Sequence, residues 1–141
     1  TGVQTCALPI YLVKKGYKFR SETDTEVILC AYEEYGFNCL EKLNGMFSFT
    51  IWDSNKEILF CARDRFGEKP LYYYFDGLKF YYGSNISYIF ALMNKKTILN
   101  ENKISFFLSY GPKSLFVDNN TFFNDIIRYF NRRVRDQPFG W

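Results

Sequence analysis

Apolar and polar side chains alternate most regularly between residues 46 and 63. In Met46–Trp52 the side chains of Phe47, Phe49 and Ile51 fall on one side, and those of Met46, Ser48, Thr50 and Trp52 fall on the other. This period of two is typical of a strand with one buried face. Four polar residues follow, with the turn-forming composition Asp-Ser-Asn-Lys, and Glu57–Arg63 then repeats the alternation. The pattern predicts an antiparallel hairpin with both strands in the core.

A charged break separates this hairpin from the next apolar run. It reads Arg-Asp-Arg-Phe-Gly-Glu-Lys-Pro over residues 63–70, and Leu71–Phe75 then resumes the strand pattern. Gly67 can adopt a positive φ, while Pro70 fixes φ where the next strand starts. The composition therefore predicts a rigid corner with locally paired charges.

The region before residue 46 predicts a strand followed by a helix. Tyr11–Arg20 is a short basic stretch in which Tyr17 and Phe19 alternate with Lys18 and Arg20, which favours a strand. Thr23 and Glu26 match the capping box, so a helix should begin there and end at Gly36. Its apolar face should consist of Val27, Cys30, Ala31 and Tyr35. A short helical turn is expected over Phe37–Asn44.

The region after Phe75 predicts a second hairpin and two helices. Asp76-Gly77 is a two-residue turn signal, with the return strand over Leu78–Gly83. Ser84 should cap a helix that runs to about Met93. Ile104–Tyr110 should form another helix, ended by a Gly-Pro pair.

Composition and charge narrow the classes of function. The chain has 141 residues, of which 48% are hydrophobic and 21% aromatic, so it is one strand-rich globular domain rather than a disordered segment. A net charge of +3 is too small to indicate nucleic-acid binding, and no apolar run approaches the length of a membrane span. There is no histidine, and the four cysteines form no Cys-x-x-Cys pair, which argues against a zinc site or a Ser-His or Cys-His pair. We expect a reducing, cytoplasmic location and no membrane or nucleic-acid partner.

Three strings carry a family resemblance: GMFSFTIWD, LFCARDRFGEKPLYYY and SETDTEVIL. They closely resemble the glutamine-hydrolysing domain of asparagine synthetases, which are class II glutamine amidotransferases. The resemblance implies an α+β fold, the N-terminal-nucleophile αββα sandwich, here incomplete because leading strands are missing. It also implies that the parent protein is an ATP-dependent ligase that amidates aspartate with ammonia from glutamine. Serine and glutamate usually stand where this chain has Ser84-Asn85.

Asp24 is the one substrate-binding candidate. A carboxylate in a first helical turn is common, because it is stabilised by the helix dipole. In the family that SETDTEVIL resembles, however, the aspartate at this position holds the α-ammonium of glutamine. The resemblance therefore favours Asp24 as a ligand of glutamine.

The resemblance also implies what this chain lacks. The family's nucleophile is an N-terminal cysteine, supported by Arg-Gly-Pro-Asp and Asn-Gly-Glu motifs, and none of these occurs here; Cys6 lacks the expected context. We expect no catalytic residue, metal or cofactor in this chain, with ATP and magnesium bound by the synthetase domain of the parent. That parent could act as a homodimer.

The expected organisation has three parts: residues 1–10 as an artefactual leader, 11–93 as the C-terminal part of the glutaminase domain, and 94–141 as a linker toward the synthetase domain. The arginines of Tyr129–Trp141 are more typical of a solvated tail than of a phosphate site. Two other readings stay open. The parent could amidate a sugar or peptide precursor, or the chain could be a non-catalytic β-rich interaction module.

Overall fold

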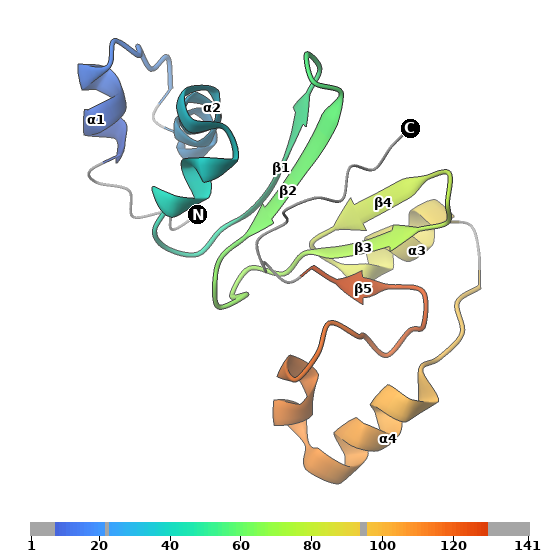
Figure 1. Ribbon diagram of the computed structural model, residues 1–141. Helices are drawn as coiled ribbons and strands as arrows, with labels where there is room; N and C mark the ends of the chain where they lie inside the picture. The colour runs from blue at the N-terminus through green and yellow to red at the C-terminus, as the bar shows by residue number, and fades with distance from the viewer. Residues whose placement is uncertain (1–7, 22, 94–95, 130–141) are drawn as a thin grey trace. The chain divides into compact units, whose positions relative to one another are not determined.

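A computed structural model describes residues 8–21, 23–93 and 96–129, and the chain divides into two compact units at Glu68. Both units combine helices with antiparallel strands, so the α+β class predicted from the sequence is confirmed (Figure 1).

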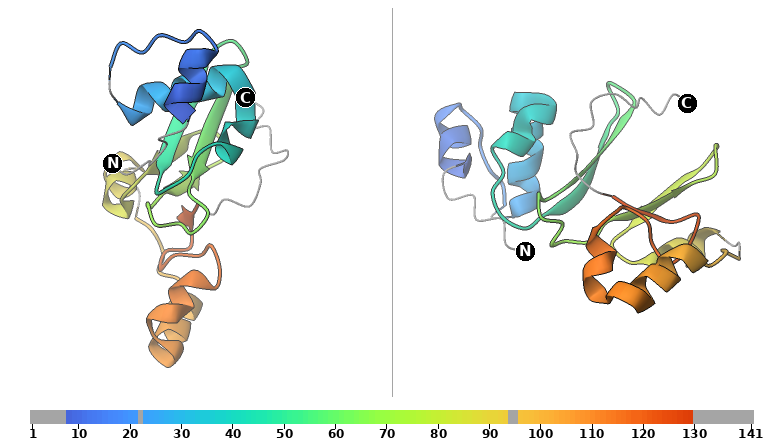
Figure 2. Two further views of the ribbon diagram at one scale, coloured as in Figure 1. Left: turned by 90° about the vertical axis from the view of Figure 1, so that its left-hand side faces the viewer. Right: turned by 60° about the horizontal axis from the view of Figure 1, so that its bottom comes forward.

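The first unit consists of two helices, a 3-10 helix and one hairpin. Its elements are α1 (Leu8–Lys14), α2 (Asp24–Tyr35), η1 (Gly36–Glu41), β1 (Ser48–Asp53) and β2 (Ile58–Arg63). α2 lies between α1 and the hairpin, as Figure 1 and the right-hand view in Figure 2 show. The hairpin register pairs Phe49 with Ala62 and Ile51 with Phe60. The predicted hairpin is therefore confirmed, with each strand displaced by one or two residues.

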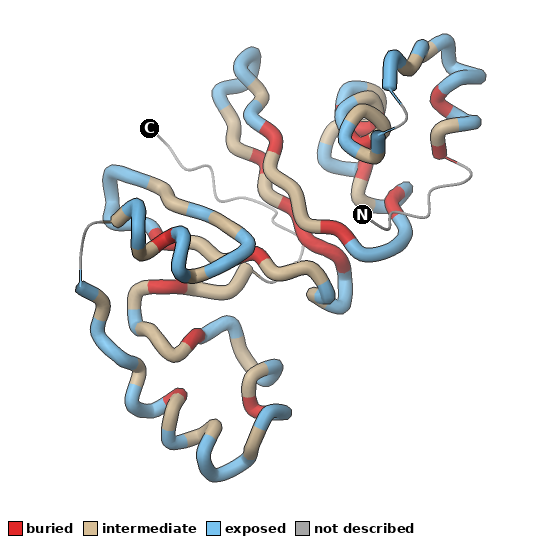
Figure 3. The backbone as a smooth tube through the Cα atoms, turned by 180° about the vertical axis from the view of Figure 1, so that it is seen from behind, coloured by how far each residue is buried: buried red, intermediate tan, exposed pale blue. Residues whose placement is uncertain are grey.

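One core holds these elements together. Figure 3 shows its buried positions on α1, α2 and both strands of the hairpin. The predicted strand face is confirmed, because Phe47, Ile51 and Phe60 are buried while Trp52 is 53% exposed. The helix face was predicted only in part. Ala31 is fully buried, but the other buried residues of α2 are Ile28 and Tyr32, which were not predicted.

The predicted strand over Tyr11–Arg20 is wrong. Residues 8–14 are helical, and the reason is the spacing of Leu8 and Leu12, which lie one helical turn apart and are both buried. The prediction assigned Leu8 to a leader and Leu12 to a strand, so their helical spacing was not recognised. The chain leaves the helix at Gly16, whose φ is 98°. Residues 1–7, including Cys6, lie outside the described part of the chain.

The second unit is a three-stranded sheet with flanking helices. Its elements are β3 (Tyr72–Phe75), β4 (Phe80–Gly83), α3 (Ile86–Met93), α4 (Glu101–Tyr110), η2 (Pro112–Phe116) and β5 (Ile127–Arg128), and the strand order is β4-β3-β5. Tyr74, Ile89 and Ile126 form its buried core. Both predicted helices are confirmed, although α4 begins three residues earlier than expected. β5 was not predicted, and it brings part of the expected linker into the sheet.

Two local predictions need correction. The turn between β3 and β4 centres on Gly77-Leu78 rather than on Asp76-Gly77, because Asp76 and Lys79 still pair across it: the Asp76 N–H donates to the Lys79 carbonyl at 3.3 Å. Helix α3 is capped by Asn85 rather than by Ser84, since the Asn85 side chain accepts from the Ser87 N–H at 2.9 Å.

The predicted corner after β2 is confirmed and is held by buried charges. Asp64 is 3% exposed and accepts from the backbone N–H groups of Phe66 and Glu68 at 3.2 and 2.9 Å. The Arg63 guanidinium is buried as well and donates to the Gly67 carbonyl. Gly67 has φ 66°, and a Cβ there would lie 2.9 Å from the guanidinium carbon of Arg63.

We expect Gly67→Ala to open this corner. The new methyl group would sit on a left-handed backbone and press against the Arg63 guanidinium, and such strain costs about 1–3 kcal/mol. Local hydrogen exchange of the Asp64 and Glu68 amide protons should therefore become about 5- to 150-fold faster. Hydrogen exchange followed by NMR measures this. Gly111→Ala is the matched control, because Gly111 has φ 70° but open space around it. Equal effects of the two substitutions would contradict the role given to Arg63.

Candidate functional site

The loop before α2 places the predicted ligand residue at the first position of a helix. Thr23 is the N-cap, with an extended backbone at φ −101° and ψ 142°. Its hydroxyl does not cap the helix and instead lies 2.9 Å from the Ser21 hydroxyl. The helix therefore begins where the sequence predicted, but the capping box is wrong in its detail.

Glu26 turns back over this loop instead of completing a capping box. Its carboxylate accepts from the backbone N–H groups of Arg20 and Ser21 at 2.8 and 2.7 Å, and from the Ser21 hydroxyl at 2.6 Å. The hydroxyl bond from Ser21, followed by the two backbone bonds, holds the pKa of Glu26 below its usual value. The ionised form is the better acceptor, so the loop is bound to a charged group.

Asp24 lies on the opposite side of the helix from Glu26. Residues 24, 28 and 31 recur at i, i+4 and i+7, so Asp24 continues the stripe that carries the buried side chains of Ile28 and Ala31. Asp24 is half-buried, and its carboxylate makes no hydrogen bond or ion pair with any residue that the structure describes. A carboxylate in this place can accept from an ammonium group while the first-turn N–H groups favour its negative charge.

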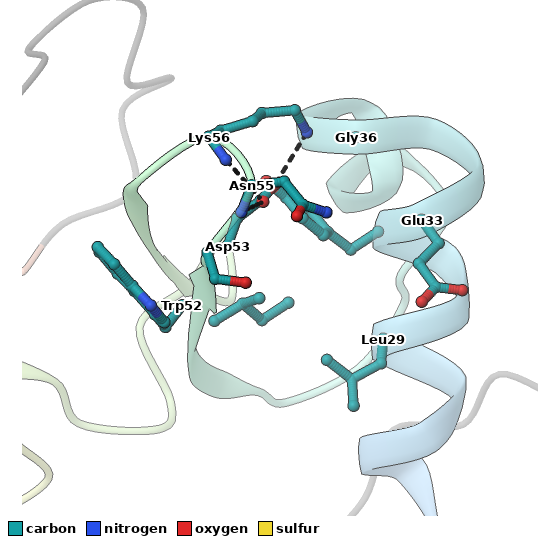
Figure 4. Close-up of a pocket in the computed structure, with 10 residues that line it drawn as sticks. Leu29, Glu33, Gly36, Trp52, Asp53, Asn55 and Lys56 are labelled. Atoms are coloured by element: carbon teal, nitrogen blue, oxygen red, sulfur yellow. Dashed lines mark hydrogen bonds and ion pairs between the residues drawn. The ribbon is translucent and has the colours of Figure 1, made fainter.

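A separate hollow lies between the C-terminal half of α2 and the hairpin turn (Figure 4). It encloses about 480 Å³. Its lining residues come from α2, the start of η1, the end of β1 and the hairpin turn: Leu29, Tyr32, Glu33, Gly36, Ile51, Trp52, Asp53, Ser54, Asn55 and Lys56. Asp24 is not among them; the nearest lining residue on α2 is Leu29, five residues or about 7.5 Å further along the helix. The structure therefore does not bring Asp24 into this hollow.

The charged groups at the hollow satisfy one another. Asp53 accepts from the Lys56 ammonium at 2.9 Å and from the Tyr32 hydroxyl at 2.8 Å, and the Lys56 ammonium also lies 5.1 Å from the centre of the Tyr32 ring. The bond from Lys56, and then that from Tyr32, lowers the pKa of Asp53 to about 2. Burial, followed by the bond to Asp53, raises the pKa of Tyr32. The sequence analysis did not identify this group; the acid and lysine three residues apart in a turn were its only local signal.

The described cysteines are poor candidates for a nucleophile. Burial raises the pKa of Cys39 to about 11 and also raises those of Cys30 and Cys61. Because the thiolate is the reactive form, these environments suppress reactivity. Cys39 is fully buried in the core of the first unit, whereas Cys30 and Cys61 are half-buried.

The remaining candidates can be placed briefly. In the described ranges, no three acidic or cysteine side chains come together in a way that could hold a metal ion. None of the described helices is both long and apolar enough to cross a membrane. The arginines at 132, 133 and 135 lie outside the described residues.

Comparison with known proteins gives one family. Residues 7–135 match the family described as "Glutamine amidotransferase domain". A protein of Methanocaldococcus jannaschii, provisionally named asparagine synthetase (glutamine-hydrolyzing) 2, is 40% identical over 116 residues, covering 78% of this chain and 22% of that protein. Asparagine synthetase (glutamine-hydrolyzing) 3 of Bacillus subtilis is 39% identical over 98 residues, covering 70% of this chain and 16% of that protein.

A fungal protein is similar as well. Amidase chry2 of Gibberella zeae is 28% identical over 123 residues, which cover 79% of this chain and 16% of the amidase. The chain thus spans only about a fifth of the length of the relatives it matches.

We expect Lys56→Met to raise the pKa of Asp53 from about 2 toward its usual value, because the substitution removes the strongest bond to the ionised carboxylate. The pKa of Asp53 is lower in the folded state than the unfolded value of about 3.9. This carboxylate therefore contributes stability above about pH 4, and the contribution is lost as the pH falls toward 2. Titration of the Asp53 carboxyl carbon by NMR measures the shift. Lys14→Met, at the exposed end of α1, is the control; an unchanged Asp53 titration in Lys56→Met would contradict the assignment.

Proposed function

The chain belongs to the glutamine amidotransferase domain family, and from that premise we propose that it is part of a glutamine-hydrolysing asparagine synthetase. The observation that carries this proposal is the family match over residues 7–135, together with two similar proteins that bear this name. In this proposal the parent protein releases ammonia from glutamine and uses it, with ATP and magnesium, to amidate aspartate. The chain alone supplies part of the glutaminase domain and is not catalytic by itself.

The fold proposal is the αββα sandwich of N-terminal-nucleophile hydrolases, with leading strands supplied by the rest of the parent. Each unit supports it separately, because each places a helix on an antiparallel sheet: α2 on β1–β2 in the first unit, and α3 on β3–β4 in the second. A sandwich of this type repeats such a pair of layers. The division into a glutaminase part ending near residue 93 and a linker toward a synthetase domain belongs to the same proposal.

Asp24 would bind the α-ammonium group of glutamine. Two observations support this role. Asp24 is the first residue of α2, on the stripe that carries the buried side chains of the helix, and its carboxylate has no partner among the described residues. An ionised acceptor distinguishes an amino acid from a neutral amide of the same length, because only the amino acid offers a charged donor.

The nucleophile would come from the parent, as an N-terminal cysteine. Its thiolate attacks the side-chain amide carbon of glutamine and gives a tetrahedral oxyanion, which preorganised donors stabilise. The carbon–nitrogen bond then breaks, the nitrogen takes a proton and leaves as ammonia, and a thioester remains. Water hydrolyses the thioester to glutamate and restores the thiol. The raised pKa values of Cys30, Cys39 and Cys61 support assigning this step to a residue elsewhere.

Ammonia would then pass to a synthetase domain in which ATP activates aspartate as an adenylate. We place the parent in the cytoplasm, as a homodimer, with no nucleic-acid or membrane partner. A second candidate is favoured by the similarity to a fungal amidase: the same glutamine-hydrolysing module could serve the amidation of another acceptor, such as a sugar or peptide precursor.

We expect Asp24→Asn in the full-length protein to raise the KM for glutamine about 10- to 100-fold, because bonds to charged groups are worth about 1.5–3 kcal/mol. Asparagine formation from ammonium chloride should not change, since that route bypasses the glutaminase site. Steady-state assays of glutamate and asparagine release, with aspartate and ATP present, measure both.

Two results would contradict the proposal in different ways. An unchanged KM for glutamine would remove Asp24 from the site. Glutamine hydrolysis without any stimulation by aspartate and ATP would reject asparagine synthesis and favour another acceptor.

A further inference from the structure

We propose that Glu26 is a positioning residue that fixes Asp24 for binding the α-ammonium group of glutamine, by tying the loop before α2 to the first turn of the helix. The inference rests on the proposed function, because it presumes that Asp24 is the residue that contacts the substrate. Glu26 itself does not touch the substrate in this proposal.

The geometry is a three-donor contact across the start of a helix. Glu26 is the third residue of α2, yet its carboxylate reaches back past the N-cap to two residues of the preceding loop. The Arg20 and Ser21 backbone N–H groups and the Ser21 hydroxyl all donate to it, at distances between 2.6 and 2.8 Å. Short bonds from several donors to one ionised group are the strong kind, and they define the path of the loop.

A second link connects this loop to the residue next to Asp24. The Ser21 hydroxyl, which donates to Glu26, also lies 2.9 Å from the hydroxyl of Thr23. Thr23 directly precedes Asp24 and is the N-cap of α2. Glu26 therefore holds the loop on one side of the helix while the Asp24 carboxylate projects from the other side.

This arrangement addresses a general weakness of helix ends. Terminal turns fray, and the first N–H groups of a helix have no partner within it. A carboxylate that must meet an ammonium group cannot tolerate such movement, because a displacement of about 1 Å in a binding group can reduce activity on the order of a hundredfold. The lowered pKa of Glu26 is consistent with a contact that is formed in the folded chain.

Glu26→Gln is the informative variant. Glutamine has nearly the same shape, but its amide nitrogen would face a backbone N–H group, so the three-donor contact cannot be completed. Glu101→Gln is the matched control, since Glu101 lies exposed in the first turn of α4. The probes are L-glutamine and glutaramate, the analogue that lacks only the α-amino group.

The first measurement is the ratio of the two dissociation constants, by calorimetry on the full-length protein. We expect the wild type and Glu101→Gln to bind L-glutamine more tightly than glutaramate. In Glu26→Gln this preference should fall about tenfold, or about 1.4 kcal/mol, while the affinity for glutaramate stays unchanged. A purely structural role would weaken both ligands equally. If the wild type itself shows no preference, the proposed role of Asp24 fails; if it does and Glu26→Gln keeps it, only the role of Glu26 fails.

The second measurement needs no ligand. In the 141-residue chain, NMR should show the Arg20 and Ser21 amide protons titrating together with Glu26 at a pH below 4.5. The backbone order parameter at Asp24 should fall in Glu26→Gln and stay unchanged in Glu101→Gln. Absence of the linked titration, or an unchanged order parameter at Asp24, would overturn the inference.

Discussion

The contact of Tyr32 with the hairpin is the interaction on which the first unit depends. Its ring stacks on Phe60 with a 5.3 Å distance between centroids, and its hydroxyl donates to Asp53 at 2.8 Å. One side chain therefore supplies both apolar burial and a directional bond, which fix the distance and the rotation of α2 against the sheet. Since Asp24 is the first residue of the same helix, its placement follows from a contact two turns away along the helix.

Four carboxylates organise loops of this protein, and Asp24 is not one of them. Asp53, Asp64 and Asp76 each accept two backbone N–H groups that follow them in the chain, and Glu26 accepts two that precede it. Such bonds satisfy loop N–H groups that have no partner in a helix or sheet. Asp24 forms no such bond with a described residue. The contrast supports a ligand-binding role, because an acid with no loop to hold remains available to an external donor.

The sequence predicted what depends on neighbouring residues and missed what depends on distant ones. Strict alternation was sufficient for β1 and β2, and the corner at Gly67 followed from its composition. The two-residue strand β5 could not be predicted in this way, because Ile127 pairs with Tyr73, far away in the chain. The hydrogen bond between Tyr32 and Asp53 was missed for the same reason, because it joins residues that are far apart in the chain. Asp24 was found only through the resemblance, since a first-turn acid carries no local signal of a ligand.

A lone carboxylate also limits what this part of the protein could select. A bond from Asp24 to an ammonium group separates amino acids from their deaminated analogues, but it is equally available to glutamate, asparagine and glutamine. Discrimination among those requires donors for the α-carboxylate and for the side-chain amide, because a polar group left without its partner is what rejects the wrong substrate. Among the described residues, no cation forms an ion pair with the Asp24 carboxylate. In the proposed parent, this second layer of selectivity would come from the strands and motifs beyond this chain, and Glu26 would ensure that the ammonium contact is already in place when they close the site.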